Sequence, residues 1–123
     1  MAFKPFDLTG KVALITGGNG GIGLGFAEGL AAAGADVAIW GTNEAKNQAA
    51  VEKIAALGVK AKALKVDVSK EEEVVAAMAD TIKEMGRVDS VFANAGIGVR
   101  EKSMMTITAE SFRKVMGVNV DGF

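Results

Sequence analysis

Residues 16–23 read Thr16-Gly17-Gly18-Asn19-Gly20-Gly21-Ile22-Gly23, with five glycines in eight positions. The apolar run 12–15 precedes them, and a stretch with helical periodicity follows. Glycine permits a positive φ and lacks a Cβ where the backbone must approach an anion, and the start of a helix directs free N–H groups toward a phosphate. A strand, a glycine loop and a helix in this order therefore predict a phosphate-binding loop. A P-loop is excluded because no Lys-Ser/Thr pair follows the glycines, and a loop that needs only flexibility is the alternative.

Short apolar runs alternate with helical stretches along the rest of the chain. Strands are expected over residues 12–15, 37–40, 60–66 and 88–92, and helices over 22–33, 44–57 and 69–85, with a last helix after an irregular segment, 97–107. Such alternation implies right-handed crossovers and a parallel sheet. The predicted fold class is α/β: a Rossmann-type doubly wound sheet, represented by its first four strands with flanking helices.

Four local patterns lie within the predicted helices. Apolar residues at helical spacing form one stripe of the first helix: Ile22, Phe26, Leu30 and Ala33. Gly25 and Gly29 lie inside the same helix and are expected to permit close packing on the sheet. Ser69 and Glu72 have the spacing of a capping box, which predicts a helix start at Ser69. Thr108 is the expected cap of the last helix.

The composition bounds the possible chemistry. The chain has 123 residues, is 50% hydrophobic and carries a formal net charge of −1, which fits one domain and gives no basic field for nucleic acid. It has no His, Cys or Tyr, which excludes Ser-His-Asp and Cys-His catalysis, zinc sites built on Cys or His, and disulfides. Residues 1–6 lack the apolar region of a signal peptide, and the longest apolar run, 74–79, is too short to span a membrane. A cytoplasmic protein without a metal site is therefore expected.

Five motifs, in order along the whole chain, resemble those of the classical short-chain dehydrogenase/reductase family. They are the lead-in Asp7–Thr16, the glycine loop, Asp67-Val68 after the third strand, Asn94-Ala95-Gly96 after the fourth, and Val118-Asn119-Val120 in the last helix. Ala93 departs from the family pattern, which has a further Asn at that position. The resemblance implies an NAD(P)-dependent oxidoreductase that interconverts a secondary alcohol and a ketone by hydride transfer, with residues 1–123 as the N-terminal, dinucleotide-binding part of one domain.

The resemblance also assigns roles to individual residues. It gives Asp67 contact with the adenine ring, Asn94 a role in bracing the sheet, and Asn119 a catalytic role through a bound water in proton relay. The cofactor-binding residues that it implies are Gly17, Asn19, Gly20, Gly21, Ile22, Gly23, Thr42, Asp67, Val68, Asn94, Ala95 and Gly96. Purely structural interpretations remain open: Asp67 as the cap of a turn, Asn94 to Gly96 as a turn only, and Asn119 as a satisfied core amide.

The choice between NAD and NADP depends on the end of the second strand. A carboxylate there binds the ribose 2′-hydroxyl of NAD, whereas an Arg nearby accommodates the 2′-phosphate of NADP. This chain has Gly41 at the acidic position and Thr42 at the usual Arg position, so both charges are missing. Thr42, Asn43 and Asn19 could donate to a phosphate, with Lys46 one turn further on. NADP is therefore slightly preferred over NAD.

The family's chemistry needs a Tyr, a Lys four residues after it and a Ser, and this chain has no Tyr and stops four residues after Asn119. We expect it to be the cofactor-binding half of an enzyme, partnered by a missing C-terminal half and a small carbonyl or alcohol substrate, with a homo-oligomer as the complete form. One alternative is a non-catalytic dinucleotide-binding fragment. Another is a methyltransferase fold that binds S-adenosylmethionine, although Gly41 and Asn94-Ala95-Gly96 count against it.

Overall fold

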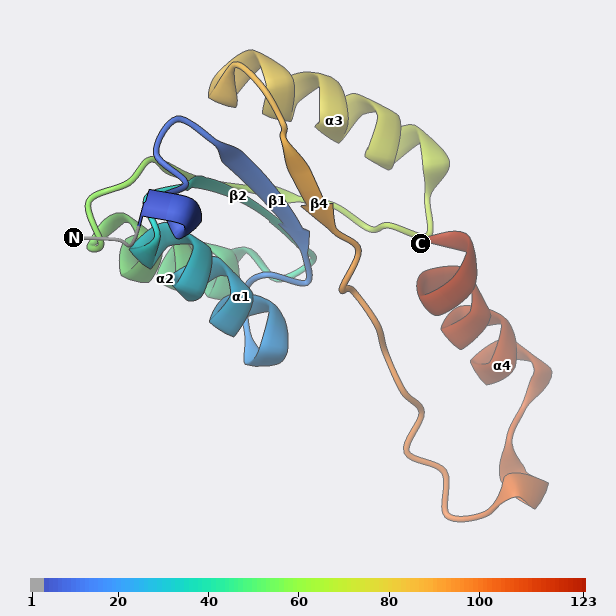
Figure 1. Ribbon diagram of the computed structural model, residues 1–123. Helices are drawn as coiled ribbons and strands as arrows, with labels where there is room; N and C mark the ends of the chain where they lie inside the picture. Colours follow the sequence, from blue (N-terminus) through green and yellow to red (C-terminus); the bar gives the residue numbers. More distant parts are fainter. Residues whose placement is uncertain (1–3) are drawn as a thin grey trace.

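The computed structural model describes residues 4–123 as a four-stranded parallel sheet flanked by helices (Figure 1). Residues 1–3, part of the stretch 1–6 that lacks the apolar region of a signal peptide, lie outside the described residues. The strands are β1 (Val12–Thr16), β2 (Asp36–Gly41), β3 (Ala61–Lys65) and β4 (Ser90–Phe92). The α-helices are α1 (Gly21–Ala32), α2 (Glu44–Ala55), α3 (Glu71–Met85) and α4 (Ala109–Met116). The predicted α/β class and the alternation of strands and helices are confirmed.

The strand order is β3-β2-β1-β4, and all three pairings are parallel. Parallel neighbouring strands need a crossover connection. Each helix between two strands therefore returns the chain to the end of the sheet where the strands begin. The order reverses between β1 and β4, which places a topological switch point at their carboxyl ends. Central strand β1 is buried along its whole length, as expected of a strand covered on both faces.

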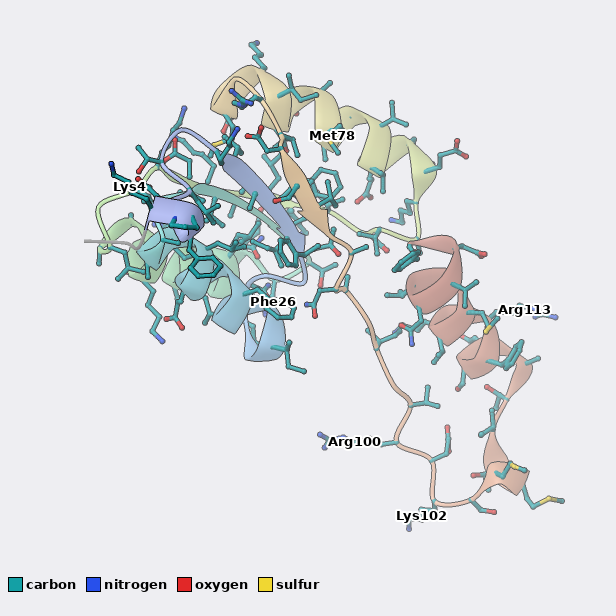
Figure 2. All side chains as sticks on the ribbon, viewed as in Figure 1. Lys4, Phe26, Met78, Arg100, Lys102 and Arg113 are labelled. Atoms are coloured by element: carbon teal, nitrogen blue, oxygen red, sulfur yellow. The ribbon has the colours of Figure 1, made fainter. Side chains whose placement is uncertain are left out.

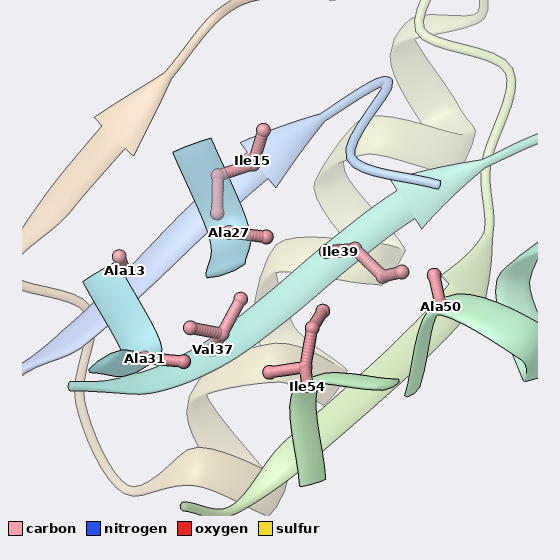
Figure 3. Packing of buried hydrophobic residues seen from close by; sticks show 8 residues of the cluster. All are labelled: Ala13, Ile15, Ala27, Ala31, Val37, Ile39, Ala50 and Ile54. Carbon is pink, nitrogen blue, oxygen red and sulfur yellow. The ribbon is translucent and has the colours of Figure 1, made fainter. Parts of the chain in front are cut away.

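Two hydrophobic clusters lie on opposite faces of the sheet. One joins β1 and β2 to α1 and α2, and Figure 3 shows its eight buried residues: Ala13, Ile15, Ala27, Ala31, Val37, Ile39, Ala50 and Ile54. The other joins the opposite face of the same strands to α3, through residues that include Leu14, Trp40 and Ala77. Helices on both faces are the mark of a doubly wound sheet, so the predicted architecture is confirmed.

The core-facing stripe of α1 differs from the predicted one. The buried residues are Gly23, Ala27 and Ala31, one position beyond Ile22, Phe26 and Leu30. Small residues therefore face the sheet, whereas Phe26 of the bulkier stripe lies 5.4 Å from Phe92 of β4, centroid to centroid. The expected packing role of Gly25 and Gly29 is also wrong, because a Cβ on either would have no neighbour within 4 Å.

The start of α3 corrects a second expectation. Lys70, rather than Ser69, is the N-cap residue, and it makes no side-chain capping bond. The Ser69 hydroxyl instead donates to Asp67 Oδ1 at 2.6 Å, and Glu73 Oε2 accepts from the Asp67 backbone N–H at 2.8 Å. Ser and Asp side chains commonly form such local turns in competition with helix caps. The predicted capping box with Glu72 is therefore wrong.

Beyond β4 the chain leaves the sheet. Residues 97–107 run away from it, with one 3-10 turn at Met104–Thr106, before α4 returns (Figure 1). Figure 2 shows Arg100 and Lys102 on this segment, far from the two packed faces. Thr108 Oγ1 accepts from the Ser111 N–H, which confirms the predicted cap. A π-helical turn, Gly117–Asp121, follows α4. Within residues 4–123, every helix is too short or too polar to span a bilayer.

Candidate functional site

A cavity of about 260 Å³ opens at the carboxyl ends of the strands. Its lining comes from all four strand ends and from the π-helical turn: Gly17, Asn19, Trp40, Gly41, Thr42, Val66, Asp67, Val68, Ala95, Gly96, Ile97 and Val118. This position is the edge of an open α/β sheet where ligands bind, beside the switch point between β1 and β4. We call it the strand-end pocket.

The glycine loop forms one wall of this pocket. Gly17 and Gly21 adopt φ values of 67° and 55°, in the left-handed region that favours glycine. Gly20 precedes α1 as its N-cap and offers no side chain, and the first turn of α1 contains no acidic residue. The N–H groups and the positive end of the helix dipole are therefore available to an anion.

Gly23 occupies the tightest position in the loop. A Cβ on Gly23 would lie 2.2 Å from the Gly17 carbonyl oxygen and 2.6 Å from Asn94 Nδ2. Real Cβ atoms do not approach other atoms so closely, so α1 can begin this near β1 and β4 only with glycine here. Glycine is therefore required here for close packing of the loop, which counts against a loop that needs only flexibility.

Asn94 and Thr16 tie the ends of β4 and β1 together. Thr16 Oγ1 accepts from the backbone N–H groups of Asn94 and Ala95, both at 3.0 Å. The Asn94 side chain donates from Nδ2 to the Thr16 carbonyl oxygen at 3.1 Å. These bonds fix the spacing between the ends of β1 and β4 at the switch point. The expected bracing role of Asn94 is thus seen directly, and Ala95 and Gly96 then line the pocket.

Asp67 supplies the only charged side chain of the pocket lining. The Ser69 hydroxyl and then the Ser69 backbone N–H hold the pKa of the Asp67 carboxyl below its ordinary value, with smaller contributions from Lys70 and Lys114. Both hydrogen bonds go to Oδ1. Asp67 therefore presents an ionised carboxylate at the pocket edge, suited to accept from an amino group, while it also organises the turn that follows β3.

The end of β2 presents no acidic group to the pocket. Gly41 ends β2 and is buried, Thr42 is exposed beside it, and Asn43 caps α2 by accepting from the Lys46 backbone N–H at 3.0 Å. Asn19 lies against Gly41 and donates to Asn47 at 2.9 Å. The end of β2 is therefore lined by neutral polar groups, as its sequence indicated.

The family model described as short chain dehydrogenase matches residues 11–123. The chain belongs to the short-chain dehydrogenase family. It is 39% identical over 116 residues to a 2,5-dichloro-2,5-cyclohexadiene-1,4-diol dehydrogenase of Sphingobium indicum, covering 94% of this chain and 45% of that protein. This short-chain dehydrogenase chain thus spans a little under half the length of that curated relative.

Solved structures agree with the family assignment. An NAD⁺-bound xylitol dehydrogenase is 31% identical, with a TM-score of 0.89 over 94% of this chain and 44% of that one. An NADPH-dependent 3-quinuclidinone reductase from Rhodotorula rubra is 36% identical, with a TM-score of 0.83 over 95% of this chain and 44% of that one. Both nicotinamide dinucleotides therefore occur among the short-chain dehydrogenase neighbours of this fold.

Asn119 lies in the π-helical turn of this short-chain dehydrogenase chain. Its Nδ2 donates to the Ile97 carbonyl oxygen at 2.9 Å, and its Oδ1 accepts from the Ile97 N–H at 2.8 Å. This reciprocal pair holds the segment after β4 against the helix beside Gly96. These bonds satisfy the Asn119 amide, but the residue is exposed, so its interpretation as a core amide is wrong. Its catalytic role stays a prediction.

The predicted site residues divide into two groups. One group lines the strand-end pocket: Gly17, Asn19, Thr42, Asp67, Val68, Ala95 and Gly96. The other does not line it: Gly20, Gly21, Ile22, Gly23, Asn94 and Asn119. Their contacts with a cofactor stay a prediction. Within residues 4–123 no three acidic side chains gather as a metal site would require.

Sequence reasoning missed three residues that shape the site. Thr16 and Asn47 are buried polar residues with hydrogen bonds across elements, and Trp40 lines the pocket while its indole N–H donates to Thr81 Oγ1 at 3.0 Å. The position of Thr16, a polar residue at the end of a buried strand, could have indicated that its side chain bonds to a neighbouring strand. Nothing in the pattern around Asn47 distinguished it from the exposed polar residues beside it on α2.

Proposed function

We propose that this chain binds a nicotinamide dinucleotide as the cofactor-binding part of an oxidoreductase that interconverts a secondary alcohol and a ketone. The observation that carries the proposal is the strand-end pocket with the glycine loop as its wall, where a Cβ on Gly23 would lie 2.2 Å from the Gly17 carbonyl. Family membership and the cofactors named for the neighbouring structures support it. The bound nicotinamide would give or accept the hydride.

The residues present fit the adenosine and pyrophosphate parts of such a cofactor. The loop 17–23 offers backbone N–H groups and a helix start to the two phosphates. Asp67 can accept from the adenine amino group, and Asn94 ties the ends of β1 and β4 together by its bonds to Thr16. Ala95 and Gly96 leave the far side of the pocket without bulky side chains.

We further propose a modest preference for NADP over NAD. Gly41 places no carboxylate at the end of β2, so nothing there repels a 2′-phosphate. Thr42 is exposed at this point, and Asn19 lines the same wall. Both side chains can donate to phosphate oxygens, and both can also meet a hydroxyl, so the preference is expected to be small.

Turnover is proposed to depend on residues outside this sequence. The family's proton transfer uses a Tyr with a Lys and a Ser, and this sequence contains no Tyr. Residues 1–123 would then bind and orient the cofactor, with Asn119 close to the site, while another part of the enzyme holds the substrate. A binding module without chemistry is the second candidate, favoured by the same absence of Tyr. The cytoplasmic location and the homo-oligomer stay predictions.

One fluorescence titration tests the proposal. Trp40 lines the pocket and is the only Trp of the chain, which also has no Tyr, so its emission reports on that site alone. Titration with NADPH and NADH should quench the Trp40 emission in a saturable manner, with the tighter binding for NADPH. If neither dinucleotide binds, both candidate functions are wrong. Ketone-dependent NADPH oxidation by the chain alone would contradict the assigned dependence on an outside Tyr.

A further inference from the structure

Asn47 is buried near the start of α2 and does not line the strand-end pocket. Its Nδ2 donates to the carbonyl oxygen of Gly41 at 2.9 Å and to that of Leu64 at 3.3 Å, at the ends of β2 and β3. Both partners are backbone acceptors, so only the nitrogen side of the amide can face them. The orientation of the Asn47 amide is therefore set by the sheet.

This orientation determines that of Asn19 in the glycine loop. Asn47 Oδ1 faces away from the two carbonyls and accepts from Asn19 Nδ2 at 2.9 Å. Because an amide oxygen can only accept, Asn19 must direct its NH₂ group at Asn47. Among the described residues the Asn19 side chain has no other hydrogen-bond partner, so its oxygen and its second N–H stay available at the pocket wall.

The two amides also occupy the space beside Gly41. A Cβ on Gly41 would lie 2.3 Å from Asn19 Nδ2 and 2.4 Å from Asn47 Oδ1. An acidic side chain at this position would have to displace both amides. A side chain at position 41 would therefore require the Asn19 and Asn47 amides to move, and in this chain a neutral, oriented pair occupies that space.

We propose that Asn47 is a positioning residue of the dinucleotide site. It holds the Asn19 amide at the ribose end of the pocket and, through it, sets the discrimination between a 2′-phosphate and a free 2′-hydroxyl. An oriented N–H can donate to a phosphate oxygen, and the pair carries no negative charge that would repel it. Without Asn47 the Asn19 amide rotates freely, and its bond to the phosphate competes with other orientations. The inference rests on the proposed function.

Two adenosine probes test this role without the nicotinamide or any turnover. Binding of 2′,5′-ADP and of 5′-AMP is measured by Trp40 fluorescence for the unaltered chain and for Asn47→Ala. The ratio of the two affinities should fall about 3- to 10-fold in the variant, the range expected for loss of one hydrogen bond, through weaker binding of 2′,5′-ADP. The affinity for 5′-AMP should stay within about twofold. An unchanged or increased ratio, or an equal loss for both probes, overturns the proposal.

Further variants separate positioning from folding. Asn19→Ala leaves the Asn47 bonds to the sheet in place and should lower the same ratio, which keeps the test available if Asn47→Ala does not fold. In the Asn19→Ala background, Asn47→Ala should have no further effect on the ratio, and an additional fall would overturn the action through Asn19. Gln48→Ala is the matched control, because Gln48 is exposed and, within residues 4–123, its side chain bonds only to Glu52. If the unaltered chain binds neither probe, the proposed function itself is wrong.

Discussion

Gly23 and Gly25 lie two residues apart on α1 and differ in what surrounds them. Gly23→Ala places a Cβ 2.2 Å from the Gly17 carbonyl oxygen, so the loop or the helix must move. We expect a destabilisation of about 1–3 kcal/mol, typical of overpacking, and loss of NADPH binding. Chemical denaturation and Trp40 titration measure the two effects.

Gly25→Ala is the matched control for that substitution. Its Cβ would meet nothing within 4 Å, so the change removes only the conformational freedom of glycine in a helix. It should stabilise the protein by about 0.5–1 kcal/mol and leave NADPH binding intact. Equal behaviour of the two variants would contradict the assignment of Gly23 as the site of closest approach.

The Asp67 carboxyl contributes to how the stability of the folded protein depends on pH in the acid range. Hydrogen bonds from Ser69 lower the pKa of Asp67 in the folded protein. Its charged carboxylate is therefore more favoured in the folded protein than in the unfolded chain. The stabilisation is fully present above the unfolded pKa of about 4 and is lost as the pH falls through the folded value. Ser69→Ala should raise the Asp67 pKa toward its ordinary value and flatten this part of the profile.

Carboxyl-carbon NMR titration of Asp67 checks that prediction, together with melting temperatures recorded from about pH 6 down to about pH 2. Ser103→Ala is the control, since the Ser103 hydroxyl accepts from the Met105 N–H and has no hydrogen bond to a carboxylate within residues 4–123. The account fails if both variants leave the Asp67 pKa where it is in the unaltered protein.

At the scale of elements, α3 is attached to the sheet by a polar contact as well as by apolar packing. The Trp40 indole N–H donates to Thr81 Oγ1 at 3.0 Å, and both side chains are buried. Thr81→Val keeps the shape but leaves the indole N–H without a partner, which should cost about 1–3 kcal/mol. Denaturation monitored by Trp40 emission measures the loss. Asp80→Asn, on the exposed side of the same helix, should change stability by less than about 0.5 kcal/mol.

The buried face of α1 differs from the predicted one because the helix has two apolar stripes. Two stripes of this helix are apolar, one led by Ile22 and Phe26 and the other by Gly23 and Ala27, and periodicity favours the bulkier one. The choice between them depends on how close the helix must come to β1 and β4. That distance is set by the glycine loop, and periodicity carries no information on it.

For the whole molecule, the sheet with α1 to α3 forms the packed part, and residues 97–107 are exposed throughout. Because protease cleavage needs a segment that can leave its packing, trypsin should cut first after Arg100 and Lys102 (Figure 2). Mass spectrometry of a timed digest should show a fragment that ends at one of these residues and persists. Earlier cleavage in α2, at Lys46 or Lys53, would contradict the distinction between the packed part and the exposed residues 97–107.

The main features of the fold and site could be predicted from local pattern. The strand periods, the glycine loop and the polar residues after β3 and β4 are local, and the sheet order brings them to one edge. The Asn19–Asn47 pair joins residues 28 positions apart, and Thr16 and Asn94 are 78 apart. Such pairs depend on the register and crossovers of the complete sheet. No window of sequence contains both partners.

Residue type and order alone therefore determined the α/β class, the glycine loop between β1 and α1, and the absence of an acidic residue at the end of β2. Only the tertiary structure decided which face of α1 is buried, that Ser69 serves Asp67 rather than the helix, and that two amides occupy the space beside Gly41. The physical reason is that hydrophobic period and glycine freedom act within a few residues. Close approach and hydrogen-bond orientation depend on distances between elements, and those exist only after the sheet has assembled.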